Sequence, residues 1–247
     1  YDFVKHPRSP WQTPYRSTRI WTQDEILGEL VDKPYFAPGG GWHYSTTNYL
    51  LLRKVAEAVG PAGVCTEIQS RFLRPLGLNR TVCIDPMGQM PPNLRIADNW
   101  LPGGFVSLAA KPEPWAVTSP VLIFATAEDL ARWLDVLFYT KRALAPELVG
   151  QMLTFHSPAP NDPPLSGYGL GVAYVDETLV EESFGVKGVR MWGHGGSTHG
   201  YRAIAMYLPE SEASIACLIN ADSDRSLVTI FRAILQVVVG HPGASGP

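Results

Sequence analysis

The hydrophobic periodicity changes near residue 167, and this change constrains the fold more than any other feature of the chain. Before it, apolar residues recur at helical spacing, most clearly over Leu130–Phe138 behind a capping Thr126. After it come short runs rich in β-branched and aromatic residues, at 168–175, 201–208 and 214–220. An apolar run, Leu227–Val239, then fits a closing helix. Helices followed by antiparallel strands and a helix predict an α+β fold with helices packed on an antiparallel sheet.

Three further helices are expected from their boundary residues. Thr22–Glu25 has the spacing of a capping box, which marks a helix start. Thr46–Val59 is expected to be a helix closed by a glycine and a proline, and Pro146 fits the first turn of another helix. These patterns divide the chain into a mostly helical and loop region, 1–160, and a region of antiparallel strands plus a C-terminal helix, 161–247.

Charge and composition exclude several classes of protein. The 247 residues carry 20 basic and 23 acidic side chains, so the chain lacks the basic excess of a nucleic-acid-binding protein. No run approaches the ~18 consecutive apolar residues of a transmembrane helix. The 3 cysteines are too few for a disulfide framework or a zinc site. Their spacing allows a Cys65–Cys83 bridge, but three buried thiols are the favoured interpretation.

Two polar clusters could carry chemistry. Trp42–Tyr49 lies where a glycine-rich loop meets a helix start, and Gly193–Gly200 lies at the entry to a strand. A helix N-terminus offers free backbone N–H groups, and N–H donors beside glycines suit the oxyanion of acyl transfer. Both clusters also have simpler interpretations. Tyr44 could be a packed residue with a satisfied hydroxyl, Ser45 or Thr46 only an N-cap, and the glycine cluster a tight turn.

Five short segments match, in order, the motifs of one enzyme superfamily: Pro38–Leu52, Phe72–Leu78, Ala125–Trp133, Tyr168–Val172 and Gly193–Gly196. Their counterparts are the Tyr-x-Asn segment, F-x-P-L-G-M/L, S-T-A-x-D-L-A-R-W, Y-G-L-G-W and G-H-x-G. Together they resemble serine hydrolases of the β-lactamase/penicillin-binding-protein superfamily, most closely its class C β-lactamase and family VIII esterase branch. The resemblance implies a β-lactamase/transpeptidase-like fold: an antiparallel sheet flanked by helices with a mostly helical subdomain, in one discontinuous catalytic domain overall.

The resemblance also implies roles for individual residues. Tyr44 matches the tyrosine that moves protons during acylation and deacylation, and His194 stands where the third motif has lysine or histidine and lines the site. The backbone N–H of Ser197 would be one of two oxyanion-hole donors. Gly195 and Gly196 would let the strand edge approach the substrate. No cofactor and no metal is implied.

Thr46 departs from the family pattern, because the motif has asparagine there. A threonine lacks the amide that would hold a substrate carbonyl. This puts β-lactam or peptide-type substrates in doubt more than simple esters. Substrate contacts are also expected from tryptophans near the cleft, although ordinary packing explains them equally well: Trp42, with Trp11, Trp100, Trp115 and Trp192.

A second departure is larger, because no Ser-x-x-Lys occurs in the 247 residues. Tyr1-Asp2-Phe3 resembles the point just after the family's L-L-x-H-T-S-G-L element. We therefore expect the nucleophilic serine and its lysine upstream of Tyr1, together with the first helix and strands of the sheet. That missing N-terminal segment, or another chain, would complete the sheet.

The sequence thus supports a serine hydrolase that acts through an acyl-enzyme on an ester or amide, as a carboxylesterase or D-amino-acid peptidase-like enzyme. Its substrate would be a small-molecule ester, an amide or a peptide. The 247 residues alone are expected to be inactive. Alternatives are a non-catalytic penicillin-binding-protein-like binding module or degenerate homologue, and a class C-like β-lactamase. Family relatives favour the cell envelope or secretion over the cytoplasm, but the sequence leaves the location open.

Overall fold

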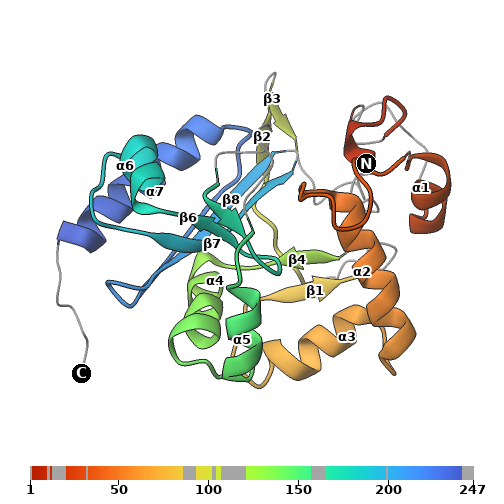
Figure 1. The fold of residues 1–247 in the computed structure, drawn as a ribbon, viewed down its shortest axis with the longest axis horizontal. Coiled ribbons are helices and arrows are strands. Elements are labelled where there is room, and N and C mark those ends of the chain that lie inside the picture. The colour runs from red at the N-terminus through yellow and green to blue at the C-terminus, as the bar shows by residue number, and fades with distance from the viewer. Residues whose placement is uncertain are drawn as a thin grey trace. The chain divides into compact units, whose positions relative to one another are not determined.

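A computed structural model describes the following residues of the chain: 2–9, 12, 21–31, 33–85, 93–101, 104–106, 121–156, 165–198 and 200–240. They form two compact units (Figure 1). Unit 1 comprises Tyr1–Asp98 and Val106–Phe124, and unit 2 comprises Asn99–Phe105 and Ala125–Pro247. The boundary at residue 160 that the sequence suggests marks the change from helices to strands. The helices after residue 125 belong to the same compact unit as the sheet, and the division at residue 160 stays a prediction from the sequence.

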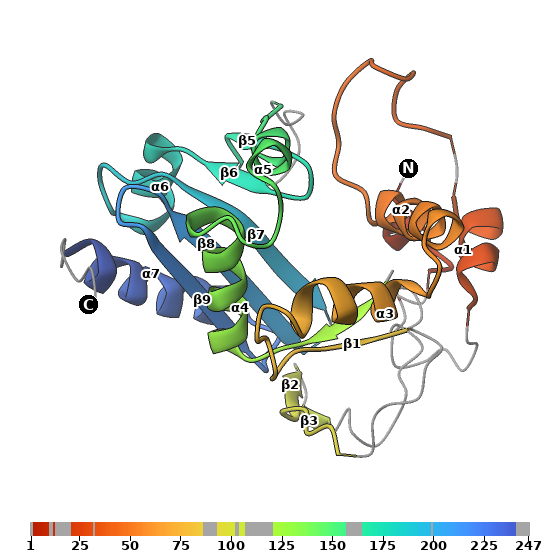
Figure 2. The same ribbon diagram turned by 90° about the horizontal axis from the view of Figure 1, so that it is seen from below.

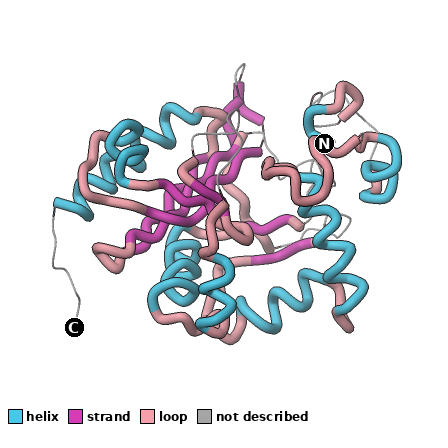
Figure 3. The backbone as a smooth tube through the Cα atoms, viewed as in Figure 1, coloured by secondary structure: helices cyan, strands magenta, loops and turns pink. Residues whose placement is uncertain are grey.

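Unit 2 contains a five-stranded antiparallel sheet, and Figure 3 draws the strands in magenta. The strand order of this sheet is β5-β6-β7-β8-β9. Its strands are β5 (Gly167–Tyr168), β6 (Ala173–Val175), β7 (Met191–Thr198), β8 (Tyr201–Leu208) and β9 (Ala213–Ile219). The antiparallel sheet predicted from the sequence is therefore confirmed. The run expected as one strand at 168–175 is instead two short strands, since the chain turns at Gly171, whose φ is 75°.

Helices cover both faces of this sheet (Figures 1 and 2). They are α4 (Ala127–Leu134), which continues as the π-helical η5 (Asp135–Tyr139), α5 (Pro146–Met152), α6 (Glu177–Phe184) and α7 (Asp224–Gly240). Alternate residues of β8 point to opposite faces, as the two-residue period of a strand requires. Met206 packs with α6 and α7, whereas Tyr207 packs with α4, η5 and α5.

The boundary residues of these helices explain why they form. Thr126 caps α4 by accepting a hydrogen bond from the N–H of Asp129, and Pro146 begins α5, both as the sequence predicts. Helix α6 was not predicted. Its signals are Asp176, which caps it by accepting from the N–H of Leu179, and Gly185, which ends it at a φ of 70°.

Unit 1 is mostly helical. Its elements are η1 (Phe3–Lys5), α1 (Gln23–Glu29), α2 (Thr46–Val59), α3 (Val64–Ile68), the π-helical η2 (Gln69–Leu73), β1 (Val82–Ile84) and β4 (Leu122–Phe124). The two strands pair antiparallel, and α3 lies alongside β1 (Figures 1 and 2). The capping box at Thr22 and the bounds of α2 agree with the sequence-based prediction. A separate two-stranded ribbon is formed by β2 (Asn99–Leu101) and β3 (Gly104–Val106).

A disulfide between Cys65 and Cys83 ties α3 to β1. The expectation of three buried thiols was therefore wrong for this pair, and Cys217 alone is a buried free thiol. Sequence spacing could not decide between the two, because a bridge depends on the Cα atoms lying close in space. Here they lie 5.2 Å apart.

Candidate functional site

The Tyr44 motif lies at the N-terminus of α2, where backbone N–H groups lack helical partners. Ser45 is the N-cap: its buried hydroxyl accepts a hydrogen bond from the N–H of Thr47 at 3.2 Å. The Thr47 hydroxyl in turn accepts from the N–H of Phe3 at 3.0 Å. Ser45 is thus a structural residue, as its simpler interpretation held. Its cap leaves Tyr44 just outside the helix.

Burial raises the pKa of Tyr44 to about 12, and the nearby Tyr49 and Asp2 act in the same direction. A hydrogen bond with the side chain of Thr46 opposes the rise. Thr46 therefore contacts the motif's tyrosine from the position where the family has asparagine. A phenol with this pKa is neutral near pH 7, so it can donate a proton. It can accept one only if a cation lowers its pKa.

Asp2 is a buried carboxyl group beside this helix end, and sequence reasoning did not single it out. It is 4% exposed, and burial raises its pKa, while hydrogen bonds from the N–H groups of Val4 and Thr46 lower it. A carboxylate at a helix N-terminus satisfies a free N–H and the helix dipole together. The signal that could have revealed Asp2 was its place in the segment that resembles the family.

The loop before Tyr44 is held by stacked aromatic rings. His43 stacks on Tyr35, with ring centroids 4.2 Å apart and planes at 2°, and Lys5 lies 5.7 Å from the Tyr35 centroid. The His43 Nδ1 atom lies 2.7 Å from the carbonyl oxygen of Tyr44. Trp42, the predicted substrate contact, is half-buried in the same loop. This loop is therefore ordered by its own side chains.

The second candidate cluster is the outer part of β7. Residues 193–198 are strand, so the interpretation of this cluster as a tight turn was wrong; the turn follows at Gly200, whose φ is 77°. Strand β6 pairs only with Met191–Gly193. From His194 onward, β7 pairs with β8 on one side and with no strand of the described chain on the other. Gly195, Gly196 and Ser197 are exposed along this edge.

Gly193 has a packing reason to be glycine. A Cβ there would lie 2.0 Å from the carbonyl oxygen of Ala205 on the neighbouring strand. At Gly195 the nearest atom would be 3.7 Å away, and at Gly196 it would be 3.4 Å away. The first glycine is thus required for strand pairing. The other two keep the edge free of side chains.

Arg202 fastens the hairpin that joins β7 to β8. Its guanidinium donates to the carbonyl oxygens of Thr198 at 2.6 Å and Tyr201 at 3.0 Å. It also pairs with Asp222, and with Asp224 at 2.6 Å, at the start of α7. The arginine side chain is 14% exposed. Sequence reasoning missed this residue, because its partners are brought together only by the fold.

His194 contacts Tyr168, a residue of the Y-G-x-G segment to which the sequence gave no role. The Tyr168 hydroxyl lies 2.8 Å from Nε2 of His194, and Nδ1 lies 2.5 Å from the carbonyl oxygen of Gly195. Trp192, one of the tryptophans considered for an acyl pocket, packs instead against Phe138, edge to face at 6.3 Å. The side chains of Trp11, Trp100 and Trp115 lie outside the described residues.

The predicted site residues therefore form two groups. Tyr44, Thr46 and Trp42 lie together in unit 1, and His194 lies with Gly195, Gly196 and Ser197 in unit 2. That the two groups meet in one active site remains a prediction from the family resemblance. Within the described residues, no group of three or more His, Cys, Asp or Glu side chains could hold a metal ion. No helix there is long and apolar enough to cross a membrane.

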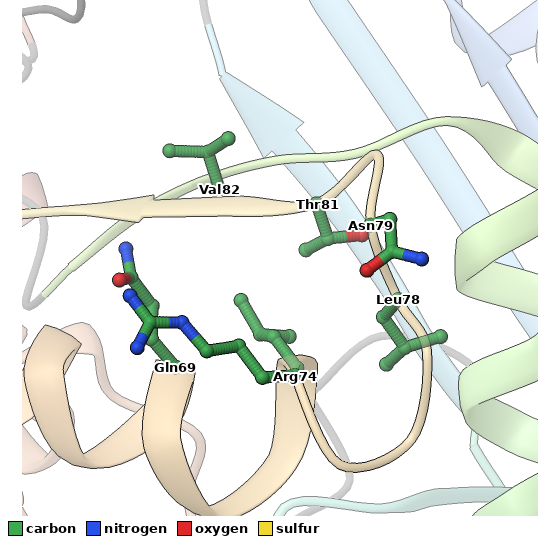
Figure 4. A pocket seen from close by; sticks show the side chains of 7 residues that line it. Gln69, Arg74, Leu78, Asn79, Thr81 and Val82 are labelled. Atoms are coloured by element: carbon green, nitrogen blue, oxygen red, sulfur yellow. The ribbon is translucent and has the colours of Figure 1, made fainter.

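A small pocket of about 230 Å³ opens in unit 1 between η2 and β1 (Figure 4). It is lined by Gln69, Leu73, Arg74, Leu78, Asn79, Thr81 and Val82. It is smaller than the roughly 300–1,000 Å³ of most ligand pockets and contains none of the predicted site residues. We assign it no part in the chemistry.

An antiparallel sheet covered by helices on both faces, with a glycine-rich strand edge exposed beside it, is the architecture of the β-lactamase and penicillin-binding-protein superfamily of serine hydrolases. The chain belongs to the beta-lactamase family, whose family model matches residues 19–239. This confirms the resemblance and the fold that the sequence indicated.

Solved structures with this fold include a D-stereospecific amidohydrolase from Streptomyces sp., which is 23% identical with a TM-score of 0.70. The match covers 93% of this chain and 67% of that one. The D-amino acid amidase from Ochrobactrum anthropi SV3, solved with D-phenylalanine, is 19% identical over 96% of this chain and 74% of that one, with a TM-score of 0.69. An octameric penicillin-binding protein homologue from Pyrococcus abyssi is 23% identical over 91% of this chain and 49% of that one, with a TM-score of 0.68.

Proposed function

We propose that these residues belong to a serine hydrolase that cleaves an ester or amide through an acyl-enzyme. The observation that carries the proposal is the open edge of β7. Gly195, Gly196 and Ser197 are exposed there, and the same strand pairs with β8 on its other side. An edge of this kind presents N–H groups to a substrate without side chains in the way. In this proposal the N–H of Ser197 stabilises the oxyanion, an interaction that is typically worth about 100- to 1,000-fold in kcat.

Tyr44 transfers protons to and from the reacting serine and the leaving group. Its pKa of about 12 makes the neutral phenol a ready proton donor, but a poor base. A nearby cation is needed to lower that pKa, and the lysine of a Ser-x-x-Lys motif would supply the charge. Because the 247 residues contain no such motif, we propose that the nucleophile and its lysine precede Tyr1.

The proposed substrates are carboxylic esters and simple amides, including those of D-amino acids. The solved amidohydrolase and amidase with this fold support the amide class. Thr46 favours esters and small amides over β-lactams, because its hydroxyl is hydrogen-bonded to Tyr44 and it carries no amide to hold a substrate carbonyl. Trp42, in the loop before Tyr44, would contact the acyl group.

We also propose export from the cytoplasm and completion of the sheet by further chain. The Cys65–Cys83 disulfide supports an oxidising compartment. In the part of the chain described, β9 pairs with β8 alone, so its outer edge is open to another strand. A segment before Tyr1, or another chain, would occupy that edge.

The test is covalent labelling by a fluorophosphonate, with hydrolysis of p-nitrophenyl esters measured in parallel. The protein encoded by the longest natural reading frame that contains these residues should be labelled on a serine of a Ser-x-x-Lys motif before Tyr1. The 247 residues alone should be neither labelled nor active. Labelling of a serine within the 247 residues would contradict the proposed position of the nucleophile.

A non-catalytic binding module is the second candidate, and the absence of Ser-x-x-Lys together with Thr46 favours it. In that case the longer protein would also resist labelling. It would bind an ester or peptide ligand without turnover.

A further inference from the structure

Both ring nitrogens of His194 are engaged within unit 2. Nδ1 lies 2.5 Å from the carbonyl oxygen of Gly195, and Nε2 lies 2.8 Å from the hydroxyl oxygen of Tyr168. The two rings meet edge to face, with centroids 5.6 Å apart and planes at 87°. We propose that Tyr168 is a positioning residue that holds His194 in its Nδ1–H tautomer, and that His194 clamps the Gly195 carbonyl rather than transferring a proton to substrate.

The chemistry of the two contacts determines the tautomer. A carbonyl oxygen only accepts hydrogen bonds, so Nδ1 must carry the proton in its bond to Gly195. In a neutral imidazole Nε2 is then an acceptor, and the Tyr168 hydroxyl is the donor of that pair. A substrate would have to displace one of these bonds before either nitrogen of His194 could exchange a proton with it.

The Tyr168 ring is held by its surroundings. Its side chain is 6% exposed, and its backbone N–H and carbonyl both bond to His156 at 2.9 Å. On the other side, Tyr168 pairs with Ala173 of β6. The following Gly169 packs so closely that a Cβ there would lie 1.9 Å from the carbonyl oxygen of Met152. These contacts hold the Tyr168 side chain in place, with its hydroxyl beside His194.

His194 holds the β7 edge where two glycines are adjacent. Two adjacent glycines, Gly195 and Gly196, leave the peptide between them the widest choice of orientation. The carbonyl of the first and the N–H of the second belong to one planar group, so holding the carbonyl also fixes the N–H. The catalytic consequence rests on the proposed function: the fixed Gly195–Gly196 peptide adjoins the Gly196–Ser197 peptide, and so limits how far the N–H of Ser197 can turn away from the oxyanion.

Nitrogen-15 NMR of the 247-residue chain, labelled at histidine, tests the proposal without an enzymatic assay. In the neutral form of the ring, observed at alkaline pH, His194 should carry its proton on Nδ1. Tyr168→Phe should lower the ratio of Nδ1–H to Nε2–H forms about five-fold, the equivalent of one hydrogen bond. The matched control, Tyr174→Phe on β6, removes a hydroxyl that makes no hydrogen bond to any described residue, and should leave the ratio unchanged.

An Nε2–H tautomer in the wild-type chain overturns the proposal, and this result stands even if Tyr168→Phe does not fold. A ratio that Tyr168→Phe leaves at the wild-type value overturns it as well. Because no hydrolysis is measured, the predicted tautomer in a protein that hydrolyses nothing would contradict the proposed function alone.

Discussion

Unit 1 and unit 2 hold their candidate site residues in different ways. In unit 2 the edge at 194–197 belongs to a strand whose register with β8 extends over seven residue pairs. In unit 1, Tyr44 precedes a helix whose first turn is satisfied by side chains: Ser45 bonds the N–H of Thr47, and Asp2 bonds the N–H of Thr46. One arrangement depends on backbone pairing and the other on a few polar groups. Different substitutions should therefore disrupt the two arrangements.

The two units also differ in how completely they bury their apolar side chains. Unit 2 buries apolar side chains on both faces of its sheet. In unit 1, α2 buries Leu50 in a cluster with Phe3, Trp21, Ile26 and Leu30, but its other side is apolar and exposed. The exposed side chains are Leu51, Leu52, Val55 and Val59, which are 50%, 59%, 58% and 80% accessible. An apolar helix face of this kind is typical of a surface that another segment covers.

Gly193→Ala should cause the largest loss of stability, and only in unit 2. The added Cβ would lie 2.0 Å from a backbone oxygen of β8, which cannot move without separating the strands. We expect a loss of about 3 kcal/mol in the free energy of unfolding, measured by urea denaturation. Gly195→Ala is the control, since its Cβ would meet nothing closer than 3.7 Å. Equal losses in both variants would contradict the register of β7 on β8.

Removal of the disulfide should weaken unit 1 while leaving the sheet of unit 2 intact. The bridge joins residues 18 apart in sequence, so replacing Cys65 and Cys83 with alanine should cost about 3 kcal/mol. Hydrogen exchange should quicken in α3 and β1 but not in β7–β9. Cys217→Ala, which removes the buried free thiol, is the control for loss of a cysteine. Faster exchange throughout unit 2 would show that the two units do not respond separately.

Arg202→Met should loosen the hairpin between β7 and β8. The arginine holds two carbonyl oxygens and two aspartates in a setting where its side chain is only 14% exposed. We expect a loss of about 2 kcal/mol, since Asp222 would be left half-buried without its partner. Arg132→Met should cost less than about 0.5 kcal/mol, because its pair with Glu128 is exposed and spans 3.5 Å. If Arg202→Met lowers the free energy of unfolding no more than the control does, Arg202 does not stabilise the hairpin.

Tyr44 should make the free energy of unfolding of unit 1 fall at alkaline pH. Its pKa is about 12 when folded and about 10 when unfolded, so the folded state keeps this proton more tightly. Its contribution is therefore fully present below pH 10 and is lost as pH rises toward 12. The free energy of unfolding should fall by about 2 kcal/mol more in the wild-type chain than in Tyr44→Phe over that range. If the free energy of unfolding depends on pH in the same way in both proteins, the raised pKa of Tyr44 is contradicted.

The sequence predicted those elements whose signals are local. The capping box at Thr22, the cap at Thr126 and the helix Thr46–Val59 form as expected, because caps and helical periodicity act within a few residues. The strand run at 168–175 was misjudged, because a glycine turn divides it and the pattern of apolar residues does not reveal that.

The contacts of the candidate site could be predicted only in part. Motif order predicts Tyr44 and His194 as site residues, since both lie in segments that resemble a known family, and their roles stay predictions. Asp2, Tyr168 and Arg202 were missed, because each has a partner that is distant in sequence: Thr46 for Asp2, His194 for Tyr168 and Asp222 for Arg202. Local sequence carries no signal for such long-range contacts.

In the proposed acyl-enzyme reaction, Tyr44 is the residue of the 247 that transfers protons. The most direct test is kcat/KM for a p-nitrophenyl ester, measured on the protein of the natural reading frame and on its Tyr44→Phe variant. Tyr139→Phe, which removes an exposed hydroxyl of unit 2, is the control and should keep wild-type turnover. We predict a fall of about 100-fold or more in Tyr44→Phe, the usual contribution of general acid–base catalysis. Turnover of Tyr44→Phe equal to that of the wild type would contradict a proton-transfer role for Tyr44.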